Sequence, residues 1–244
     1  MKLSELFSRC LNATYIHTEC GGDYAIDLDG DTLYLFFECS DGKEDWINNF
    51  DFIPDNYEER DETSLLASIA IKAGTVAISE YLNLPVKPYK DMPKSWRVHG
   101  GFLKVWKAMQ NEIEYKVAKH LLEEHQINNI VCVGYSHGGA LSLLATEDMA
   151  FLYGDRINVS GYGFGAPRVL WGIIPKTIKS RLKGFKVIRN IPDLVTHVPP
   201  ALFGFSHGGK VVKIGKRGKY NMIKAHRPES YIAELELLEE RTDE

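Results

Sequence analysis

The chain has 244 residues, of which 44% are hydrophobic and 25% are charged. This length and composition suit one large hydrophobic core, so we expect a single domain over residues 1–244. The formal net charge of −4 gives no general electrostatic reason to bind nucleic acid or an anionic membrane, and we expect no nucleic-acid partner.

The N-terminus and the cysteines bear on the compartment. Met1–Phe7 is too polar, and has too few apolar residues, to be a secretory signal. The four cysteines show neither metal-ligand spacing nor a C-x-x-C pair, so we expect no metal site and a reduced, cytoplasmic protein. Cys132 lies in the apolar run Ile130–Val133 and is interpreted as a small buried hydrophobic residue.

Two β-prone runs stand near the N-terminus. They are Tyr24–Leu28 and Thr32–Phe37, and the turn signal Asp29-Gly30-Asp31 separates them. The pattern predicts an antiparallel hairpin at the start of the sheet.

The most apolar stretch of the chain is Leu65–Leu82. Lys72, Gly74 and Glu80 interrupt it, so it falls short of the roughly 20 apolar residues that a membrane helix needs. Its apolar residues recur at helical spacing, which predicts an amphipathic helix. Two interpretations stay open, a face packed on the core or a mobile cover over a lipid-facing site.

After about residue 95, strand-like and helix-like segments alternate, which is typical of parallel strands joined by crossover helices. The predicted helices are Phe102–His125, His137–Tyr153 and Glu229–Glu240, and the predicted strands are Ile130–Gly134, Ser160–Phe164 and Phe185–Arg189. The expected fold class is α/β, with a mostly parallel central sheet, an antiparallel N-terminal hairpin and helices on both faces. The basic run Lys210–Lys219 alternates with Val and Gly, which favours a solvated hairpin over a phosphate site.

The chemistry is predicted where the strand Ile130–Gly134 meets the next helix. Gly134-Tyr135-Ser136-His137-Gly138 has the G-x-S-x-G spacing, whose small residues let strand and helix approach closely and lift the serine clear of the sheet. A serine hydroxyl is a poor nucleophile until a base takes its proton, so it must be presented in this way. The helix that follows directs its first N–H groups toward the place of an oxyanion. We expect Ser136 as the nucleophile and the N–H of His137 as an oxyanion donor.

In an α/β hydrolase with this elbow, an acid and then a base follow the serine in chain order. Asp148 and Asp155 lie within or just beyond the helix that starts at the nucleophile. Asp193 lies just past the predicted strand Phe185–Arg189, where the carboxyl ends of strands present catalytic groups. Asp193 is therefore the expected acid.

Three histidines follow Asp193 and compete for the role of the base. His197 stands in the same loop as Asp193, and His207 stands in a Gly-rich turn. His226 precedes the last helix, on a loop that can return to the sheet edge. Position favours His226 over His207.

Beyond the triad candidates, several separated blocks of the sequence have recognisable patterns. They are Val98–Phe102 (V-H-x-G-F), Gly134–Ala140 (G-H-S-x-G-G-A, with Tyr135 in place of the usual His), Tyr162–Val169 (ending G-x-P-R-V), Ile191–Pro200 (D-x-V-x-x-x-P-P), and His226 with Tyr231 five residues later. In these blocks the chain resembles the class 3 lipases, the fungal triacylglycerol lipase-like branch of the α/β hydrolases. The resemblance implies an α/β-hydrolase fold, and it carries the nucleophile to Ser136, the acid to Asp193 and the base to His226.

The resemblance also implies a second oxyanion donor and a lid. The family's F-R-G-[ST] block with a following D-W is similar to Phe37–Ser40 followed by Asp45-Trp46, so Ser40 aligns with the donor and Trp46 begins the lid. Two features depart from the family, Glu38-Cys39 in place of Arg-Gly and a long segment between Phe52 and Val98. A carboxylate beside a site that stabilises negative charge is costly unless it points away or is paired.

The expected function is that of a serine carboxylic-ester hydrolase, a lipase or esterase that works through a Ser-Asp-His triad and an acyl-enzyme. No cofactor is expected, and the expected partners are an ester or lipid substrate and, transiently, a lipid surface. An ordinary imidazole titrates near pH ~6.5, so activity should fall below about that pH. Two alternatives remain: a catalytically impaired scaffold used for binding, which Glu38 favours, and a phospholipase or acyltransferase on the same fold.

Overall fold

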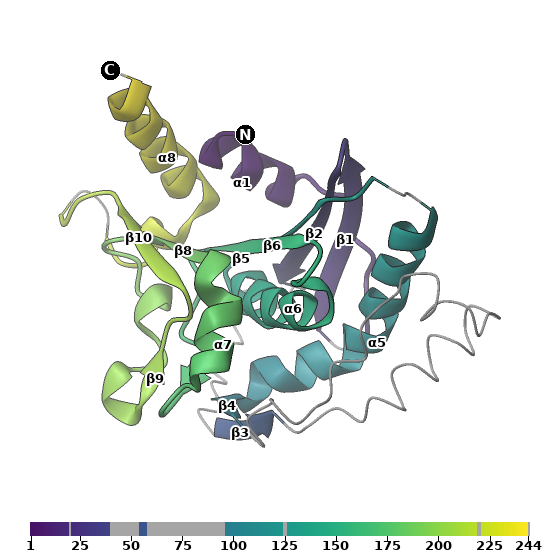
Figure 1. The fold of residues 1–244 in the computed structure, drawn as a ribbon. Coiled ribbons are helices and arrows are strands. Elements are labelled where there is room, and N and C mark those ends of the chain that lie inside the picture. Colours follow the sequence, from purple (N-terminus) through teal and green to yellow (C-terminus); the bar gives the residue numbers. More distant parts are fainter. Residues whose placement is uncertain (20, 40–53, 58–95, 124–125, 219–220, 244) are drawn as a thin grey trace.

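A six-stranded sheet runs through the centre of the computed structural model (Figure 1). The structure describes residues 1–19, 21–39, 54–57, 96–123, 126–218 and 221–243. The strands lie side by side in the order β1 (Gly22–Asp29), β2 (Thr32–Cys39), β5 (Asn129–Tyr135), β6 (Asn158–Phe164), β8 (Phe185–Asn190) and β10 (Lys210–Ile214). The β1–β2 pair is antiparallel and the other pairs are parallel, which confirms the predicted hairpin and the mostly parallel sheet.

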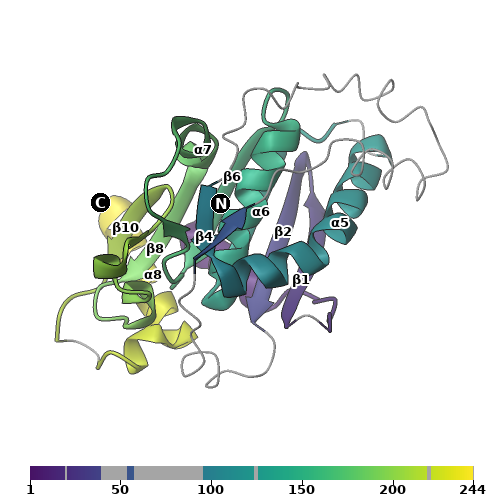
Figure 2. The same cartoon turned by 90° about the horizontal axis from the view of Figure 1, so that it is seen from below.

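Side chains on β2 alternate between the two faces of this sheet, as the pleat of a strand requires. Leu33, Leu35 and Phe37 belong to the core on one face, and Tyr34 and Phe36 belong to the core on the other. The first face is covered by α5 (Gly100–Glu123), α6 (His137–Tyr153) and α7 (Lys176–Arg181), which Figure 2 shows in front of the sheet. The second face is covered by α1 (Leu3–Leu11) and α8 (Pro228–Asp243), as Figure 1 shows.

The two helices nearest the predicted chemistry confirm the sequence interpretation. On α5, Met109, Ile113 and Val117 stand four residues apart and are buried against the core, as expected of a helix with one apolar stripe. The helix α6 begins and ends at the predicted residues, His137 and Tyr153, and nearly all of its side chains are buried because it lies between the sheet and its neighbours. Burial on this scale fixes the position of the first turn of α6.

A second, smaller sheet was not predicted. Its four antiparallel strands lie in the order β3 (Pro54–Tyr57), β4 (Trp96–His99), β7 (Leu170–Trp171) and β9 (Phe205–Ser206). Strands of two to four residues carry too short a pattern to be recognised, and their partners stand far apart in the sequence. This sheet brings His99 and Phe205 together, with 5.9 Å between their ring centroids.

The basic run that begins at Lys210 forms an edge strand rather than a hairpin arm. Residues Lys210–Ile214 pair in parallel with Lys186–Asn190 of β8, while the side chains of Lys210 and Lys213 are exposed. Edge strands often carry lysine because charge discourages pairing with another chain. The prediction that these lysines are solvated is therefore confirmed, and the prediction that the run forms a hairpin is wrong.

The short N-terminal helix α1 was also not predicted. Its residues Leu6, Phe7 and Cys10 are buried against the second face of the sheet. The N–H and hydroxyl of Ser4 both donate to the carboxylate of Glu239 on α8, over 2.9 and 2.6 Å. These bonds fasten the first helix of the chain to the last.

Four short 3-10 turns complete the described secondary structure. They are η2 (Leu182–Gly184), η3 (Val195–His197), η4 (Ala201–Phe203) and η5 (Lys224–His226). The predicted amphipathic helix Leu65–Leu82 lies outside the described residues. Within the residues that are described, no helix is long and apolar enough to cross a bilayer.

Candidate active site

The nucleophile elbow joins the end of β5 to the start of α6. Ser136 has φ 56° and ψ −121°, and within the described residues it is the one residue other than glycine with a positive φ. A Cβ on Gly134 would lie 2.0 Å from the carbonyl oxygen of Gly138, and a Cβ on Gly138 would lie 2.0 Å from that of Phe37. Both positions therefore require glycine, because the backbones approach too closely for any side chain.

Three predicted residues meet in one hydrogen-bonded chain. His226 Nε2 lies 2.8 Å from Ser136 Oγ, and His226 Nδ1 lies 2.8 Å from Asp193 Oδ2. Because an ionised carboxylate only accepts, Nδ1 carries the ring proton and Nε2 accepts the hydrogen bond from the serine hydroxyl. Asp193 is fully buried, whereas His226 keeps 18% of its side chain exposed. The arrangement can take a proton from Ser136 and hold the charge that develops on the imidazole.

Further donors hold the carboxylate of Asp193. The backbone N–H of Val195 donates to Oδ1 over 2.9 Å, and the hydroxyl of Tyr231 donates to Oδ2 over 2.6 Å. The Tyr231 oxygen also accepts the backbone N–H of Asn190 at 3.1 Å. Burial, and then the nearby Asp193 charge, raise the pKa of Tyr231 well above its ordinary value, so the phenol stays protonated as a donor.

Tyr135 supports the base from the residue before the nucleophile. Its ring stacks on the imidazole of His226, with 5.2 Å between the centroids and 21° between the planes. Its hydroxyl donates to the backbone carbonyl oxygen of His226. Phe7 of α1 packs edge-on against Tyr135 at 5.4 Å. Neither role was predicted from the sequence, in which Tyr135 stands only as a departure from the family's histidine and Tyr231 only as part of a block.

The two rival histidines brace the loop that carries the acid. His197 Nδ1 lies 2.7 Å from the carbonyl oxygen of Asp193, and its Nε2 is hydrogen-bonded by the Arg189 guanidinium. His207 Nε2 lies 2.9 Å from the carbonyl oxygen of Thr196. Burial lowers the pKa of His197, and it lowers that of His207 to about 4. The structure thus places His226 against Ser136, and it uses His197 and His207 in the acid loop.

The side chain of His137 belongs to an aromatic cluster beside the nucleophile. Its ring lies 5.3 Å from that of Phe102, which in turn stacks on His99 at 4.3 Å. Burial, and then the neighbouring His99, lower the pKa of His137 to about 4. The imidazole is therefore neutral at neutral pH, and the predicted contribution of this residue to an oxyanion rests on its backbone N–H.

Two predicted site residues, Ser40 and Trp46, lie outside the described residues. Glu38, the residue that departs from the family, is described: the strand alternation puts it on the face that α1 covers. Its charge raises the pKa values of Cys10 and Tyr15 there, after the larger effect of burial. The carboxylate therefore lies on the opposite side of β2 from Phe37, whose carbonyl contacts the elbow.

No group of three or more His, Cys, Asp or Glu side chains that could hold a metal ion is found among the described residues.

Comparison with known proteins gives a consistent set of similarities. The family described as Lipase (class 3) matches residues 34–203. A lipase of Rhizopus niveus is 33% identical over 119 residues, which cover 48% of this chain and 30% of that protein. A lipase of Rhizomucor miehei is 27% identical over 184 residues, which cover 73% of this chain and 40% of that protein. The alignments thus span less than half the length of these two relatives.

Solved structures are similar over most of the chain. One, described as a triacylglycerol lipase with a serine protease triad as its catalytic centre, matches with a TM-score of 0.57 and 20% identity, and covers 91% of this chain and 75% of that one. At this identity the likeness concerns the fold alone. It confirms the α/β-hydrolase arrangement that the sequence predicted.

Proposed function

The chain belongs to the class 3 lipase family, and on that premise we propose that it hydrolyses carboxylic esters, those of lipids foremost, with Ser136 as the nucleophile. The observation that carries the proposal is the chain of two 2.8 Å contacts from Ser136 Oγ through the His226 ring to Asp193. The similar triacylglycerol lipase described as having a serine protease triad supports the same chemistry.

In the first half of the reaction, Ser136 Oγ attacks the ester carbonyl carbon while its proton passes to His226 Nε2. The Asp193 carboxylate keeps the ring in the correct tautomer and stabilises the imidazolium. When the C–O bond to the alcohol breaks, His226 returns its proton to the leaving alkoxide. An acyl-enzyme on Ser136 remains.

In the second half, water attacks the acyl carbon and gives its proton to His226. The serine oxygen then leaves the carbon and recovers that proton, so the products are an alcohol and a carboxylic acid. No redox partner or cofactor enters this balance.

The oxyanion of each tetrahedral intermediate needs donors in place before the reaction. The N–H of His137 is the first proposed donor, because it opens helix α6, where the helix dipole leaves partial positive charge. The N–H of Ser40 is the second proposed donor, from its alignment with the family block. Trp46 is proposed as part of the lid on the same ground.

The direct test is hydrolysis of p-nitrophenyl esters of increasing acyl length by the unmutated protein and by Ser136→Ala. The expected result is turnover that Ser136→Ala reduces by about 10⁴-fold or more. Ser180→Ala, which changes an exposed serine on α7, is the matched control and should retain activity.

The same proteins are treated with a fluorophosphonate, which labels an activated serine. Labelling of the unmutated protein and of Ser180→Ala, and none of Ser136→Ala, is expected. No turnover and no labelling of the unmutated protein would overturn the hydrolase proposal in favour of a binding scaffold.

A further inference from the structure

One segment of the chain carries an excess of positive charge, although the chain as a whole has a negative net charge. The segment 194–228 contains seven Lys and Arg residues and no Asp or Glu, although the formal net charge of the whole chain is −4. The six of these cations that the structure describes are all exposed; they are Lys210, Lys213, Lys216, Arg217, Lys224 and Arg227. Because the segment contains no acidic residue, none of these charges is neutralised from within it.

Large apolar side chains are exposed in the same segment. Ile223 has 75% of its surface exposed, Met222 has 51% and Leu194 has 39%. The backbone N–H of Leu194 donates to the carbonyl oxygen of Met222 over 3.3 Å, so the three residues form one cluster from two loops. We call Leu194, Met222 and Ile223 the apolar tip. Exposed apolar side chains that gather in this way mark interaction sites more often than scattered ones do.

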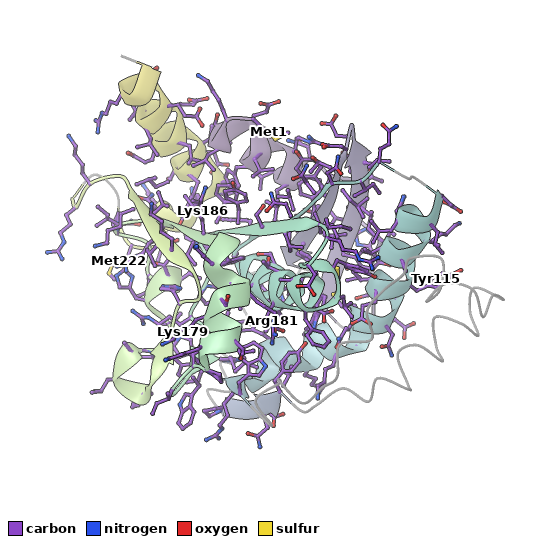
Figure 3. The ribbon with its side chains drawn as sticks, viewed as in Figure 1. Met1, Tyr115, Lys179, Arg181, Lys186 and Met222 are labelled. Carbon is purple, nitrogen blue, oxygen red and sulfur yellow. The ribbon has the colours of Figure 1, made fainter. Side chains whose placement is uncertain are left out.

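The apolar tip adjoins the acid and the base of the triad along the chain. Leu194 directly follows Asp193, and the N–H of His226 donates to the carbonyl oxygen of Ile223 over 3.1 Å. Lys216 and Arg217 follow the end of β10, where the N–H of Ile191, three residues before Leu194, donates to the carbonyl oxygen of Ile214 over 3.0 Å. Figure 3 shows Met222 at the outer margin of the molecule, on the side where β10 lies.

We propose that the apolar tip, with Lys216, Arg217 and Lys224, docks the protein on an anionic phospholipid bilayer. The cations contact the lipid phosphates and carboxylates, and the side chains of Met222 and Ile223 enter the boundary between headgroups and acyl chains. This combination favours a bilayer over nucleic acid, because phosphate backbones attract the cations but give no reason to expose isoleucine and methionine. The same segment also exposes Leu202 and Phe203, which extends its apolar character.

The docking surface rests on the proposed function only in its purpose, which is to deliver Ser136 to esters in the bilayer. Binding itself does not need catalysis. It is therefore measured in the Ser136→Ala protein, which leaves the vesicles intact.

The test is co-sedimentation with two kinds of vesicle, pure phosphatidylcholine and a mixture of two parts phosphatidylcholine to one part phosphatidylserine. Binding to the mixed vesicles is expected to exceed binding to the neutral ones by about tenfold or more, and to fall steeply between about 0.05 and 0.5 M salt. Lys216→Glu/Arg217→Glu is expected to reduce the partition coefficient at least about tenfold. Met222→Ser/Ile223→Ser is expected to reduce it about threefold or more.

The matched control is Lys104→Glu/Lys179→Glu, which makes the same change in net charge at exposed lysines of α5 and α7. It should bind like the parent protein. Circular dichroism and thermal unfolding verify that each variant is folded, and the salt dependence of the parent protein is a measurement that needs no variant.

Three results would overturn the docking surface. They are equal binding to the two vesicles, an equal loss in the control pair, and full binding by the folded Met222→Ser/Ile223→Ser variant, which would indicate a purely electrostatic surface for another anion. Hydrolysis of a soluble ester by the unmutated protein separates this failure from that of the proposed function. Turnover without vesicle binding overturns the docking surface alone, and vesicle binding without turnover overturns the hydrolase proposal alone.

Discussion

The hydroxyl of Tyr231 and the Nδ1 of His226 converge on the same carboxylate oxygen, Oδ2 of Asp193, at 2.6 and 2.8 Å. One carboxylate oxygen thus accepts hydrogen bonds from both the base and a structural donor. The tyrosine comes from α8, so the last helix of the chain contributes to the orientation of the acid. Its hydroxyl is also the acceptor for the buried N–H of Asn190, which connects the acid to the end of β8.

Tyr231→Phe removes this donor while keeping the ring. A hydrogen bond to a charged group contributes about 1.5–3 kcal/mol, and the Asn190 N–H also loses its acceptor, so the free energy of unfolding should fall by about 2–3 kcal/mol. We expect kcat to fall about tenfold with little change in KM, because Asp193 then holds His226 less firmly. Urea denaturation and soluble-ester kinetics measure the two effects. A change in KM alone would contradict a positioning role.

Tyr135 is expected to position His226 by stacking more than by its hydroxyl. Tyr135→Phe keeps the ring and loses the bond to the His226 carbonyl oxygen, so kcat should fall about two- to threefold. Tyr135→Leu also loses the ring contact, and kcat should fall about tenfold. Steady-state kinetics on a short soluble ester compare the two variants. Equal losses in both would place the whole effect in the hydroxyl.

The backbone of Ser136 stores strain that a glycine would release. A residue with a side chain at φ 56°, ψ −121° costs about 1–3 kcal/mol, and glycine avoids most of this cost. Ser136→Gly is therefore expected to be more stable than Ser136→Ala by about 1 kcal/mol, although both are inactive. The difference in urea midpoints at equal slope tests this, and identical midpoints would show that the elbow is unstrained.

Stability should depend on pH through His137 and His207, whose pKa values both lie at about 4 in the folded protein. An unfolded histidine titrates near ~6.5, so between these values the unfolded chain binds protons that the folded protein does not. The stabilising effect of keeping each ring neutral is complete above about pH 6.5 and is lost as the pH falls toward 4. We expect a loss of about 2 kcal/mol per group across this window.

Urea denaturation at several pH values between about 4 and 7 measures this loss. His137→Leu removes one titrating group from the buried cluster, so its unfolding free energy should depend less steeply on pH than that of the parent. Parallel curves for the two proteins would assign the pH dependence to other groups.

The long elements of the fold were predictable because their patterns are local. The 17 residues of α6 and the buried stripe of α5 carry enough helical turns for their period to be recognised. The helix α1 has the same kind of pattern, since Leu3, Leu6, Phe7 and Cys10 recur at helical spacing, but the prediction for this segment concerned only a secretory signal. The second sheet gave no such signal, because its strands β7 and β9 have two residues each.

In the candidate site, too, the residues that local patterns mark were predictable, and those that depend on tertiary packing were not. Ser136 stands in a contiguous motif, and Asp193 follows a recognisable strand, so both positions follow from local patterns. The choice of His226 rather than His207 as the base depends on where the two loops that carry these histidines lie in space. Chain order favours His226 but does not decide between them. The contacts of Tyr135 and Tyr231 depend on how α1 and α8 pack on the second face of the sheet, which no single segment of the sequence encodes.

The bonds between Ser4 and Glu239 have a consequence for engineering. They join α1 to α8, and α8 also carries Tyr231, whose hydroxyl donates to Asp193 over 2.6 Å. An engineered change in either helix therefore also affects the other, and through α8 it reaches the acid of the triad.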